Sequence, residues 1–343
     1  MKVRQAVVMV GGLGTRLRPL TESCPKPALP VAGRPCLWYL LRSMSRAGIE
    51  EIILACGYRS AMMREALGDG SDLGVRIRYS YEDEPRGTGG ALKLLEKELD
   101  PVFVAANGDV YADIDVSAEV ERHFSSGADI TVALTEVPNP WEFGVARISD
   151  EGFISEFREG MKPEEVYSNL INAGVYVVDK RVMESVPEGV FYDFSKHLFP
   201  EIIARSGKIA GYPLSGTWMD VGRPSDYVKA NLHVAGAEPR VLGKVSGSEI
   251  SGPFYLAEGS EACDSKLDSV SVMPNVSIKR ASIRRAVVLD GSVIEGATVE
   301  DSIVGRGCRI MEGAKVVNSV LADGDVVGPG ETRDDGRDDG RDV

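Results

Sequence analysis

Residues 5–35, QAVVMVGGLGTRLRPLTESCPKPALPVAGRP, begin with an apolar run and pass directly into a glycine-rich loop. A short apolar run that is rich in valine is typical of a buried strand. The loop and the prolines after it hold four cations and one acid, Glu22, although the whole chain has a formal net charge of -13. This local excess of positive charge predicts an anion-binding site directly after the strand. The four cations are Arg16, Arg18, Lys26 and Arg34.

Up to about residue 240, short apolar runs alternate with segments of helical period. This alternation predicts an α/β fold with a sheet of mostly parallel strands, in which ligands bind outside the carboxyl ends of the strands. The run VFVAANGD, residues 102–109, also ends in a polar turn, at Asp109. We therefore expect the glycine-rich loop and Asp109 to lie at the same edge of the sheet. The apolar runs are residues 5–10, 50–56, 75–81, 101–109 and 128–134.

From about residue 244 the helical period disappears, and aliphatic residues and glycines recur at short intervals. Aliphatic side chains about six residues apart predict stacked β-helix coils, and we expect three or four of them. The last 13 residues, ETRDDGRDDGRDV, repeat charged triplets and predict a disordered acidic tail. The expected organisation is an α/β domain over residues 1–240, a β-helix over 241–330 and the tail over 331–343.

Composition limits the class of protein. The chain has 343 residues and 43% hydrophobic content, which predicts more than one folded domain. Its acidic balance argues against a nucleic-acid partner, and no apolar run approaches the length of a membrane span, so we expect no membrane partner and a cytoplasmic protein. The cysteines are odd in number and form no C-x-x-C pair, which predicts reduced thiols rather than disulfides or a zinc ribbon. They are Cys24, Cys36, Cys56, Cys263 and Cys308.

The glycine-rich loop fits neither of two common nucleotide motifs. A dinucleotide fingerprint would have a third glycine where Leu17 stands, and a P-loop would have Gly-Lys-Ser/Thr, which is absent. Glycines at 11, 12 and 14 allow left-handed backbone conformations that expose amides to a phosphate. The prolines on both sides of Lys26 stiffen the backbone and aim its ammonium. The segment therefore predicts phosphate binding by a different arrangement.

The same segment resembles the signature of the sugar-1-phosphate nucleotidylyltransferases, or NDP-sugar pyrophosphorylases. It matches G-G-x-G-T-R-L-x-P-L-T, then P-K-P and P-V-x-G-x-P. The resemblance continues through EPRGTGGAL (84–92), NGDVYADID (107–115), NLINAGVYVVD (169–179) and GTWMDVGRPSDY (216–227). It implies a Rossmann-like mixed sheet of the GT-A type followed by a short left-handed β-helix. It also implies a reaction in which a sugar 1-phosphate attacks the α-phosphorus of a nucleoside triphosphate, giving NDP-sugar and pyrophosphate.

The resemblance assigns roles to the charged residues. Arg16 would be the main catalytic cation, because a planar guanidinium can bind the leaving β- and γ-phosphates with two hydrogen bonds. Lys26 would act as a point charge near the α-phosphate. Asp109 and Asp220 match the two metal-binding aspartates of the family, and Mg²⁺ prefers one or two carboxylates of this kind. From the residues alone, Asp109 could equally be a turn residue and Asp220 a helix cap.

The resemblance also implies two groups of substrate contacts. EGMKP replaces the usual contiguous Glu-Lys-Pro, so a bulge must bring Lys162 beside Glu159, or Lys162 is only a solvated lysine. Either Glu82 or Asp83 falls where the family contacts the base, and Gly87 to Gly90 provide a second loop that a ligand can approach closely. The nucleotide-binding candidates are Gly11, Gly12, Gly14, Thr15, Glu82, Gly87 and Thr88, and the sugar-binding candidates are Gly144, Glu159, Lys162 and Asn172.

Several alternatives remain open from the sequence. EPRGTGGAL is most similar to the mannose-1-phosphate guanylyltransferases, while glucose-1-phosphate uridylyl- or thymidylyltransferase activity and a non-catalytic regulatory homologue are the alternatives. Some relatives carry an acyltransferase on the β-helix, but that chemistry commonly needs a histidine base. The three histidines, His123, His197 and His233, all precede the β-helix. We expect the β-helix to support regulation or the contacts of a homo-oligomer.

Overall fold

The computed structural model describes residues 2–12, 14–57, 60–82 and 84–336. Its internal contacts divide the chain into two compact units. Unit 1 contains Met1–Gly12 and Leu37–Trp218, and unit 2 contains Leu13–Cys36 and Met219–Val343. This division differs from the predicted boundary near residue 240, because the positively charged segment packs with the C-terminal part of the chain. None of the described helices is long and apolar enough to cross a membrane.

Unit 1 is built on a mixed nine-stranded sheet in the order β10-β9-β11-β6-β1-β4-β5, with β8 beside β11 and β12 beside β8. Strands β6, β1, β4 and β5 are parallel, whereas β11 is antiparallel to β6 and β8. The apolar runs predicted as strands therefore form strands, and the sheet is mixed as expected. Its strands are β1 (Gln5–Met9), β4 (Glu51–Cys56), β5 (Arg76–Tyr81), β6 (Val102–Asn107), β8 (Ile130–Glu136), β9 (Val145–Ile148), β10 (Ile154–Arg158), β11 (Leu170–Asp179) and β12 (Ile209–Pro213).

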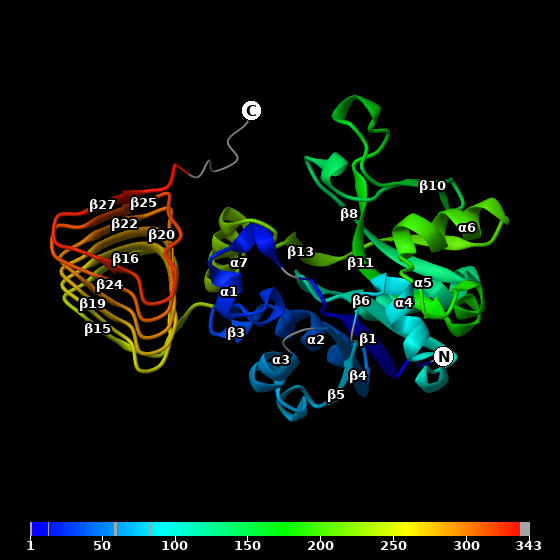
Figure 1. Ribbon diagram of the computed structural model, residues 1–343, viewed down its shortest axis with the longest axis horizontal. Coiled ribbons are helices and arrows are strands. Elements are labelled where there is room, and N and C mark those ends of the chain that lie inside the picture. Colours follow the sequence, from blue (N-terminus) through cyan, green and yellow to red (C-terminus); the bar gives the residue numbers. More distant parts are fainter. Residues whose placement is uncertain (1, 13, 58–59, 83, 337–343) are drawn as a thin grey trace. The chain divides into compact units, whose positions relative to one another are not determined.

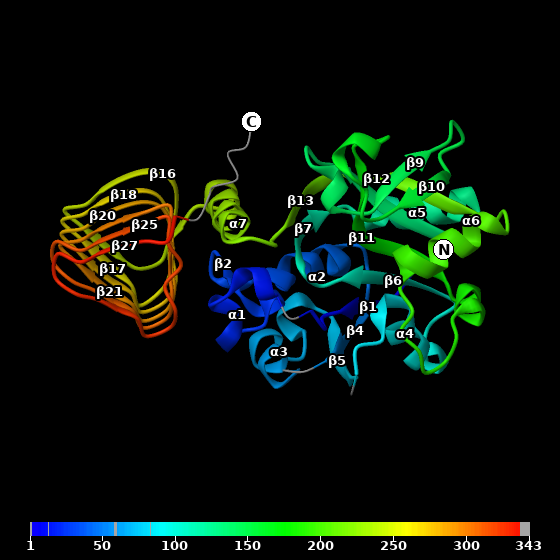
Figure 2. The same ribbon diagram turned by 45° about the horizontal axis from the view of Figure 1, so that its top comes forward.

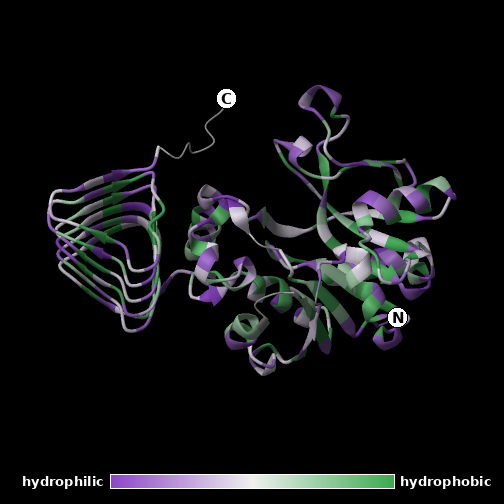
Figure 3. Ribbon diagram, viewed as in Figure 1, coloured by the Kyte–Doolittle hydropathy of each residue, from purple (hydrophilic) through white to green (hydrophobic). Residues whose placement is uncertain are grey.

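Helices cover the sheet of unit 1 (Figure 1), and buried residues of α4 (Gly87–Leu94) and α6 (Phe199–Ala204) join the strands in one core. Strand β1 is buried along most of its length, as are β4 and β6 beside it, which explains their almost continuous apolar sequences. Figure 3 shows these central strands as hydrophobic. The helices are α2 (Cys36–Arg46), α3 (Ser60–Leu67), α4 (Gly87–Leu94), α5 (Val116–Ser126) and α6 (Phe199–Ala204), with a π-helical turn, η8, over Phe194–Leu198. Strands β7 (Val110–Ile114) and β13 (Gly216–Asp220) form a separate pair.

Unit 2 contains a parallel β-helix whose stacked coils are visible in Figure 2. One of its sheets has six strands, so the expectation of three or four coils was too low. The reason is the period: Glu261 pairs with Ser277, and Ser277 with Val293, so one coil takes only 16 residues. The strands are β14 (Arg240–Val241), β15 (Lys244–Ser246), β16 (Glu249–Leu256), β17 (Glu261–Cys263), β18 (Lys266–Val272), β19 (Ser277–Lys279), β20 (Ser282–Val288), β21 (Val293–Glu295), β22 (Thr298–Glu300), β23 (Ile303–Val304), β24 (Arg309–Ile310), β25 (Lys315–Val317), β26 (Val326–Val327) and β27 (Thr332–Asp334).

Left-handed residues mark the corners of these coils. At one corner the series is Asp264, Arg280, Gly296 and Gly313, all with positive φ. Inside the coils, Ala262, Ile278, Ile294 and Ile310 form a buried ladder. The apolar repeat therefore sets the interior, and the corner residues set the turns.

The predicted tail begins later than expected. Strand β27, Thr332–Asp334, pairs in parallel with β25, so the β-helix continues past residue 330. Alternation of acidic and basic side chains does not prevent an outer strand from completing its backbone hydrogen bonds. The remainder of the predicted tail, residues 337–343, lies outside the described residues.

Unit 2 also contains the charged segment and the long helix α7 (Pro224–Ala237). The charged segment folds into short elements rather than an extended loop. They are the 3-10 turns η1 (Thr15–Leu17) and η2 (Lys26–Ala28), helix α1 (Leu20–Ser23), and the hairpin of β2 (Pro30–Val31) and β3 (Arg34–Pro35). Helix α7 packs against β2 and against the β-helix strands β16, β18 and β20.

Candidate active site

The glycine-rich loop makes its tight turn at Gly14. This residue has a φ of 60°, and a Cβ there would lie 3.0 Å from the Thr21 methyl carbon. The Thr21 hydroxyl donates a hydrogen bond of 2.8 Å to the Gly14 carbonyl, and Leu17 is buried beneath the turn. Glycine is required at this position by both conformation and space. The turn leaves the Arg16 side chain 59% exposed, where it can meet a ligand.

Arg16, Lys26 and Asp220, which the sequence assigned to catalysis and metal binding, come together in unit 2. The Lys26 ammonium lies 3.2 Å from Asp220 Oδ1, and an Arg16 guanidinium nitrogen lies 3.6 Å from Asp220 Oδ2. The Lys26 side chain is only 6% exposed, so the proline-flanked turn has placed a charge in the interior. A Cβ at Gly222 would lie 2.5 Å from Asp220 Oδ2 and 2.8 Å from the guanidinium. The glycine of DVGRP therefore allows the cation and the carboxylate to approach.

Asp109 follows β6 in a tight turn of unit 1. The amide of Gly108 donates to the Met9 carbonyl at 2.8 Å, and a Cβ at Gly108 would lie 2.5 Å from a Val10 methyl carbon. Since β6 is the neighbour of β1, Asp109 lies at the strand edge where Gly11 and Gly12 begin the loop. The shared edge predicted from the two strand ends is present. The carboxylate of Asp109 is exposed there.

The expectation for Gly11 and Gly12 needs a correction. Both glycines and Thr15 are exposed, but only Gly14 of the three glycines has a left-handed conformation. A Cβ at Gly11 or Gly12 would meet no atom within 4 Å of the described structure. The protein fold does not itself require glycine at these two positions, so their open surroundings leave room for a ligand instead.

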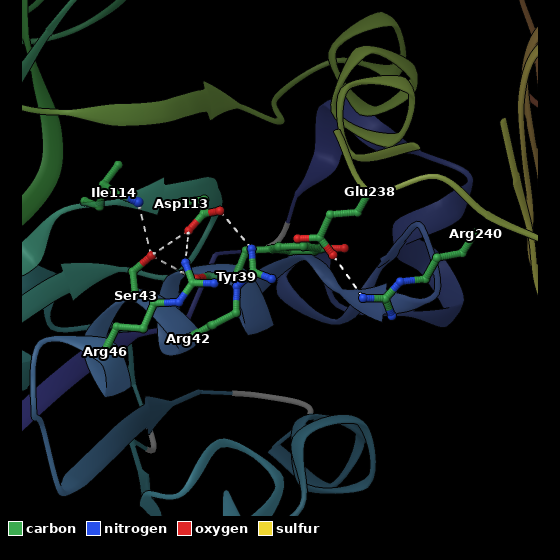
Figure 4. A network of polar contacts seen from close by, with 8 residues as sticks. All are labelled: Tyr39, Arg42, Ser43, Arg46, Asp113, Ile114, Glu238 and Arg240. Carbon is green, nitrogen blue, oxygen red and sulfur yellow. Dashed lines mark hydrogen bonds and ion pairs between the residues drawn. The ribbon is translucent and has the colours of Figure 1, made fainter. Parts of the chain in front are cut away.

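Four polar side chains tie the strand after Asp109 to helix α2 (Figure 4). Asp113 on β7 accepts hydrogen bonds from Arg42 at 2.8 Å, from Arg46 at 3.1 Å and from Ser43 at 3.3 Å. The Ser43 hydroxyl in turn accepts from the Ile114 amide at 3.1 Å. A pocket of about 340 Å³ lies beside this network, and none of the predicted site residues lines it. The network fixes the direction in which β7 leaves the Asp109 turn.

The predicted sugar contacts Gly144, Glu159 and Asn172 are neighbours in unit 1. The Asn172 amide donates to the Gly144 carbonyl at 2.9 Å. A Cβ at Gly144 would lie 3.3 Å from Glu159 Cγ and 2.4 Å from the Phe157 ring. These contacts explain why glycine is needed at 144, and they bring the three residues into one cluster.

Sequence reasoning missed Ser195, which joins this cluster. The Asn172 side-chain amide donates to the Ser195 hydroxyl at 3.3 Å and to the Tyr176 hydroxyl at 2.9 Å. Desolvation raises the pKa of the Glu159 carboxyl, and a hydrogen bond with Ser195 opposes that change. Ser195 lies in the π-helical turn η8, and Asp193 caps it by accepting from the Ser195 amide at 2.9 Å. The only sequence signal was an aspartate two residues before a serine, which is a common helix start.

Within the described residues, no hydrogen bond or ion pair joins Lys162 to the other sugar-binding candidates. It is exposed at the start of a 3-10 turn, η6 (Pro163–Glu165), and its amide donates to Glu165 at 3.1 Å. The inserted Gly-Met of EGMKP moves Lys162 along the chain, and the following proline starts the turn. Its assignment stays a prediction.

The second glycine-rich segment is a helix rather than a loop. Gly87–Gly90 form the first turn of α4, and a Cβ at Gly87 would lie 2.7 Å from the Tyr192 carbonyl. The glycines there allow the backbone near Tyr192 to pack on the helix, and the Gly90 amide donates to the Tyr192 carbonyl at 3.0 Å. The hydroxyl of Thr88 accepts from the Phe194 amide at 2.8 Å, which links this turn to η8.

Glu82 directly follows β5, and its amide donates to the Cys56 carbonyl at 3.0 Å. Burial raises the pKa of its carboxyl, against a smaller effect of the Arg86 backbone amide. Asp83, the second candidate for base contact, lies outside the described residues.

The donor set suits a hard cation. Within the described residues no group of three or more histidine, cysteine, aspartate or glutamate side chains forms a closed metal cage. Mg²⁺ does not need one, because it keeps several waters and takes one or two carboxylates together with substrate phosphates. Asp109 is exposed and Asp220 is partly exposed, so both can supply such oxygens. Each of the two carboxylates, taken by itself, is therefore the kind of ligand that the ion implied by the resemblance takes.

Comparison with known protein families decides the class of this chain. The nucleotidyl transferase family model matches residues 5–236. The chain belongs to the nucleotidyl transferase family. A second model, for the GLGC left-handed parallel β-helix domain, matches residues 271–342 and confirms the predicted hand of the β-helix.

Named relatives of this nucleotidyl transferase agree with that assignment. A mannose-1-phosphate guanylyltransferase of Mycobacterium tuberculosis is 40% identical over 66% of this chain and 63% of its own length. The catalytic subunit beta of the Drosophila melanogaster enzyme is 38% identical over 65% of this chain and 61% of its own length. A probable mannose-1-phosphate guanylyltransferase 1 of Oryza sativa subsp. japonica is 35% identical over 74% of this chain and 72% of its own length. The match thus spans less than two thirds of the first two relatives.

Solved structures give the same family. A candidate glucose-1-phosphate thymidylyltransferase from Bacillus anthracis, in complex with sucrose, superposes with a TM-score of 0.61 at 26% identity. The superposition covers 70% of this chain and 98% of the Bacillus anthracis chain. The predicted α/β nucleotidyltransferase domain with a left-handed β-helix is therefore confirmed.

Proposed function

We propose that this nucleotidyl transferase is a mannose-1-phosphate guanylyltransferase, which makes GDP-mannose and pyrophosphate from GTP and mannose 1-phosphate. The observation that carries the proposal is the Arg16-Lys26-Asp220 cluster, in a chain whose relatives from three kingdoms of organisms carry that enzyme's name. We extend the proposal to a cytoplasmic, homo-oligomeric enzyme that uses Mg²⁺.

The proposed chemistry needs charge at defined positions. A phosphate oxygen of the sugar 1-phosphate forms a bond to the α-phosphorus of GTP, and the bond to the bridging oxygen of the leaving pyrophosphate breaks. Arg16 neutralises charge on the leaving pyrophosphate, and the desolvated ammonium of Lys26 stabilises negative charge on the α-phosphate. Mg²⁺ held by Asp109 and Asp220 would neutralise further phosphate charge when bound. Asn172 and Glu159 would accept or donate hydrogen bonds to sugar hydroxyls.

A substrate panel tests this proposal. The purified protein is given GTP, ATP, CTP, UTP or dTTP with mannose, glucose or N-acetylglucosamine 1-phosphate, and pyrophosphate release is measured. We expect the highest kcat/KM with GTP and mannose 1-phosphate. Preference for UTP or dTTP with glucose 1-phosphate would support the alternative that the Bacillus anthracis structure suggests, and binding without release would support a regulatory homologue.

Arg16→Lys is expected to remove about 2–4 kcal/mol of transition-state stabilisation. The substitution should therefore lower kcat, while the KM for GTP should change little. Lysine keeps the charge but loses the two parallel hydrogen bonds that a guanidinium makes with a phosphate. Steady-state kinetics measure both constants. A wild-type kcat for Arg16→Lys, together with a large loss in Arg18→Lys, would show that the wrong cation of the segment had been chosen.

Asp109→Asn is expected to raise the Mg²⁺ concentration needed for half-maximal activity before it abolishes turnover. An amide oxygen is a weaker ligand for a hard cation than a carboxylate oxygen. A Mg²⁺ titration of pyrophosphate release measures the shift. Arg16→Lys should leave the half-maximal Mg²⁺ concentration unchanged, so an equal shift in both variants would contradict separate roles.

A further inference from the structure

Helix α7 holds the hairpin of the charged segment through two buried side chains. The Tyr227 hydroxyl donates to the carbonyl of Pro30 in β2, and Tyr227 is fully buried. Asn231, one helical turn later and also fully buried, accepts the Ala32 amide at 3.0 Å. Its side-chain amide donates to the Tyr227 carbonyl at 3.0 Å. The hairpin turn, where Ala32 has a φ of 42°, is thus fixed by side chains of α7.

The β-helix completes this arrangement. The hydroxyl of Ser271, on strand β18, donates to the same Oδ1 of Asn231 at 3.0 Å. Ser271 is fully buried, and it lies between the core residues Val270 and Val272 of the same strand. One amide oxygen therefore accepts a hydrogen bond from the charged segment and another from the β-helix. A buried polar group of this kind has a defined orientation, because every lost hydrogen bond is costly.

Two further contacts join the same segment to the β-helix. The Ser23 hydroxyl donates to Asp323 at 2.6 Å. A Cβ at Gly33 would lie 1.9 Å from the Tyr255 hydroxyl oxygen, so the hairpin turn and β16 are in close contact. The β-helix therefore meets the charged segment before and after Lys26.

We propose that Asn231 and Ser271 are positioning residues for Lys26, so that the β-helix contributes to the catalytic geometry. The proposal rests on the proposed nucleotidyl transfer. Directly after the hairpin, the Cys36 amide donates to the Leu29 carbonyl at 2.9 Å, and the Leu29 amide, directly before the hairpin, donates to the Lys26 carbonyl at 3.1 Å. These bonds link the hairpin to the lysine turn.

The same helix also fixes the partner of Lys26. Asp220 stands four residues before α7 begins at Pro224, and it accepts a hydrogen bond from the Lys26 ammonium at 3.2 Å. Both members of the Lys26–Asp220 pair thus depend on α7, one through the hairpin and one through the chain itself. A rotation or shift of α7 would move the pair, and a misplacement of about 1 Å can cost a factor of about 100 in rate. The β-helix therefore has a role in catalysis beyond the oligomer contacts or regulation expected from the sequence.

The test compares Ser271→Ala with Ser260→Ala in the full-length protein. Ser260 is equally buried in the β-helix, where it donates to Met273 at 2.7 Å and accepts from Val276 at 3.0 Å, both inside the β-helix. Each substitution removes one buried hydroxyl, so both should lower the melting temperature. We expect only Ser271→Ala to lower kcat, by roughly tenfold, and to speed hydrogen exchange of the Ala32 amide. The KM for the sugar 1-phosphate should change little.

Asn231→Ala is the stronger variant and should lower kcat further while exposing the Ala32 amide to exchange. If it fails to fold, Ser271→Ala still decides the question. Equal kcat values in Ser271→Ala and Ser260→Ala, or unchanged Ala32 exchange in Ser271→Ala, would overturn the proposal. Hydrogen exchange is measured without the reaction. An inactive wild-type protein would refute the proposed function, and the exchange of the Ala32 amide would still test whether Ser271 positions the hairpin.

Discussion

Lys26→Met is expected to lower kcat by about 100- to 1,000-fold. The ammonium is almost fully buried and lies 3.2 Å from Asp220, so it is already desolvated and oriented before substrate binds. A charge of that kind stabilises developing negative charge without reorganisation. Methionine has a similar length and no charge, and it removes the interaction without leaving a large cavity.

Three comparisons make the Lys26 experiment specific. Lys26→Arg retains the charge but replaces a compact ammonium with a wide guanidinium in a buried space, so it should recover only part of the activity. Lys180→Met is the matched control, because Lys180 is a half-buried lysine of unit 1 that donates to the Leu99 carbonyl at 2.9 Å. It should keep the wild-type kcat. If Lys26→Met kept more than about a third of wild-type kcat, Lys26 would only balance the charge of Asp220.

The sequence motifs assign Arg16, Lys26 and Asp220 to one site, but they do not indicate the side chains that support this cluster. Asp220 lies more than 190 residues after Arg16 and Lys26 in the sequence. The motifs that contain the three residues are nevertheless specific enough to assign them to one site. Gly14 and Gly222 follow from the same motifs, since each leaves space that a Cβ would fill. Such residues are predictable because their requirement is local.

Residues that act through tertiary contacts were missed. Asn231 lies on an ordinary helix and Ser271 in an ordinary strand, and nothing in either local pattern indicates that they meet at one oxygen atom. Ser195 is similar, because its role depends on the fold bringing η8 to Asn172. The glycines at 87–90 were read as a ligand loop because spacing alone cannot distinguish space for a ligand from space for another backbone.

Glu119→Gln is expected to stabilise the protein, with a gain that grows as pH rises. Glu119 lies on α5 and is fully buried, and burial raises the pKa of its carboxyl to about 8 from an ordinary value of 4.5. The Ala133 backbone amide opposes that shift only in part, and neither carboxyl oxygen has a well-formed hydrogen bond among the described residues. No substrate-binding role is assigned to it.

The direction of the pH effect follows from proton linkage. Between pH 4.5 and 8 the folded state binds the Glu119 proton more tightly than the unfolded state, so the free energy of unfolding falls as pH rises. The loss is about 1.4 kcal/mol per pH unit, of the order of 4–5 kcal/mol by pH 8, and it is complete above that pH. Below pH 4.5 both states are protonated, and the penalty is absent. Glutamine carries no charge at any of these pH values, so the variant should lack this dependence.

Urea unfolding of wild type and Glu119→Gln at pH 5, 7 and 8.5 measures the effect as a difference. Burial lowers the pKa of the neighbouring buried His123, and the pKa of Tyr212 is raised by burial with a smaller contribution from Glu119. His123 is present in both proteins, so its titration largely cancels in the comparison. Glu121→Gln, on the exposed side of the same helix, should change the free energy of unfolding by less than about 0.5 kcal/mol at each pH. A gain for Glu119→Gln that is equal at pH 5 and pH 8.5 would mean that the carboxyl is not held neutral by burial.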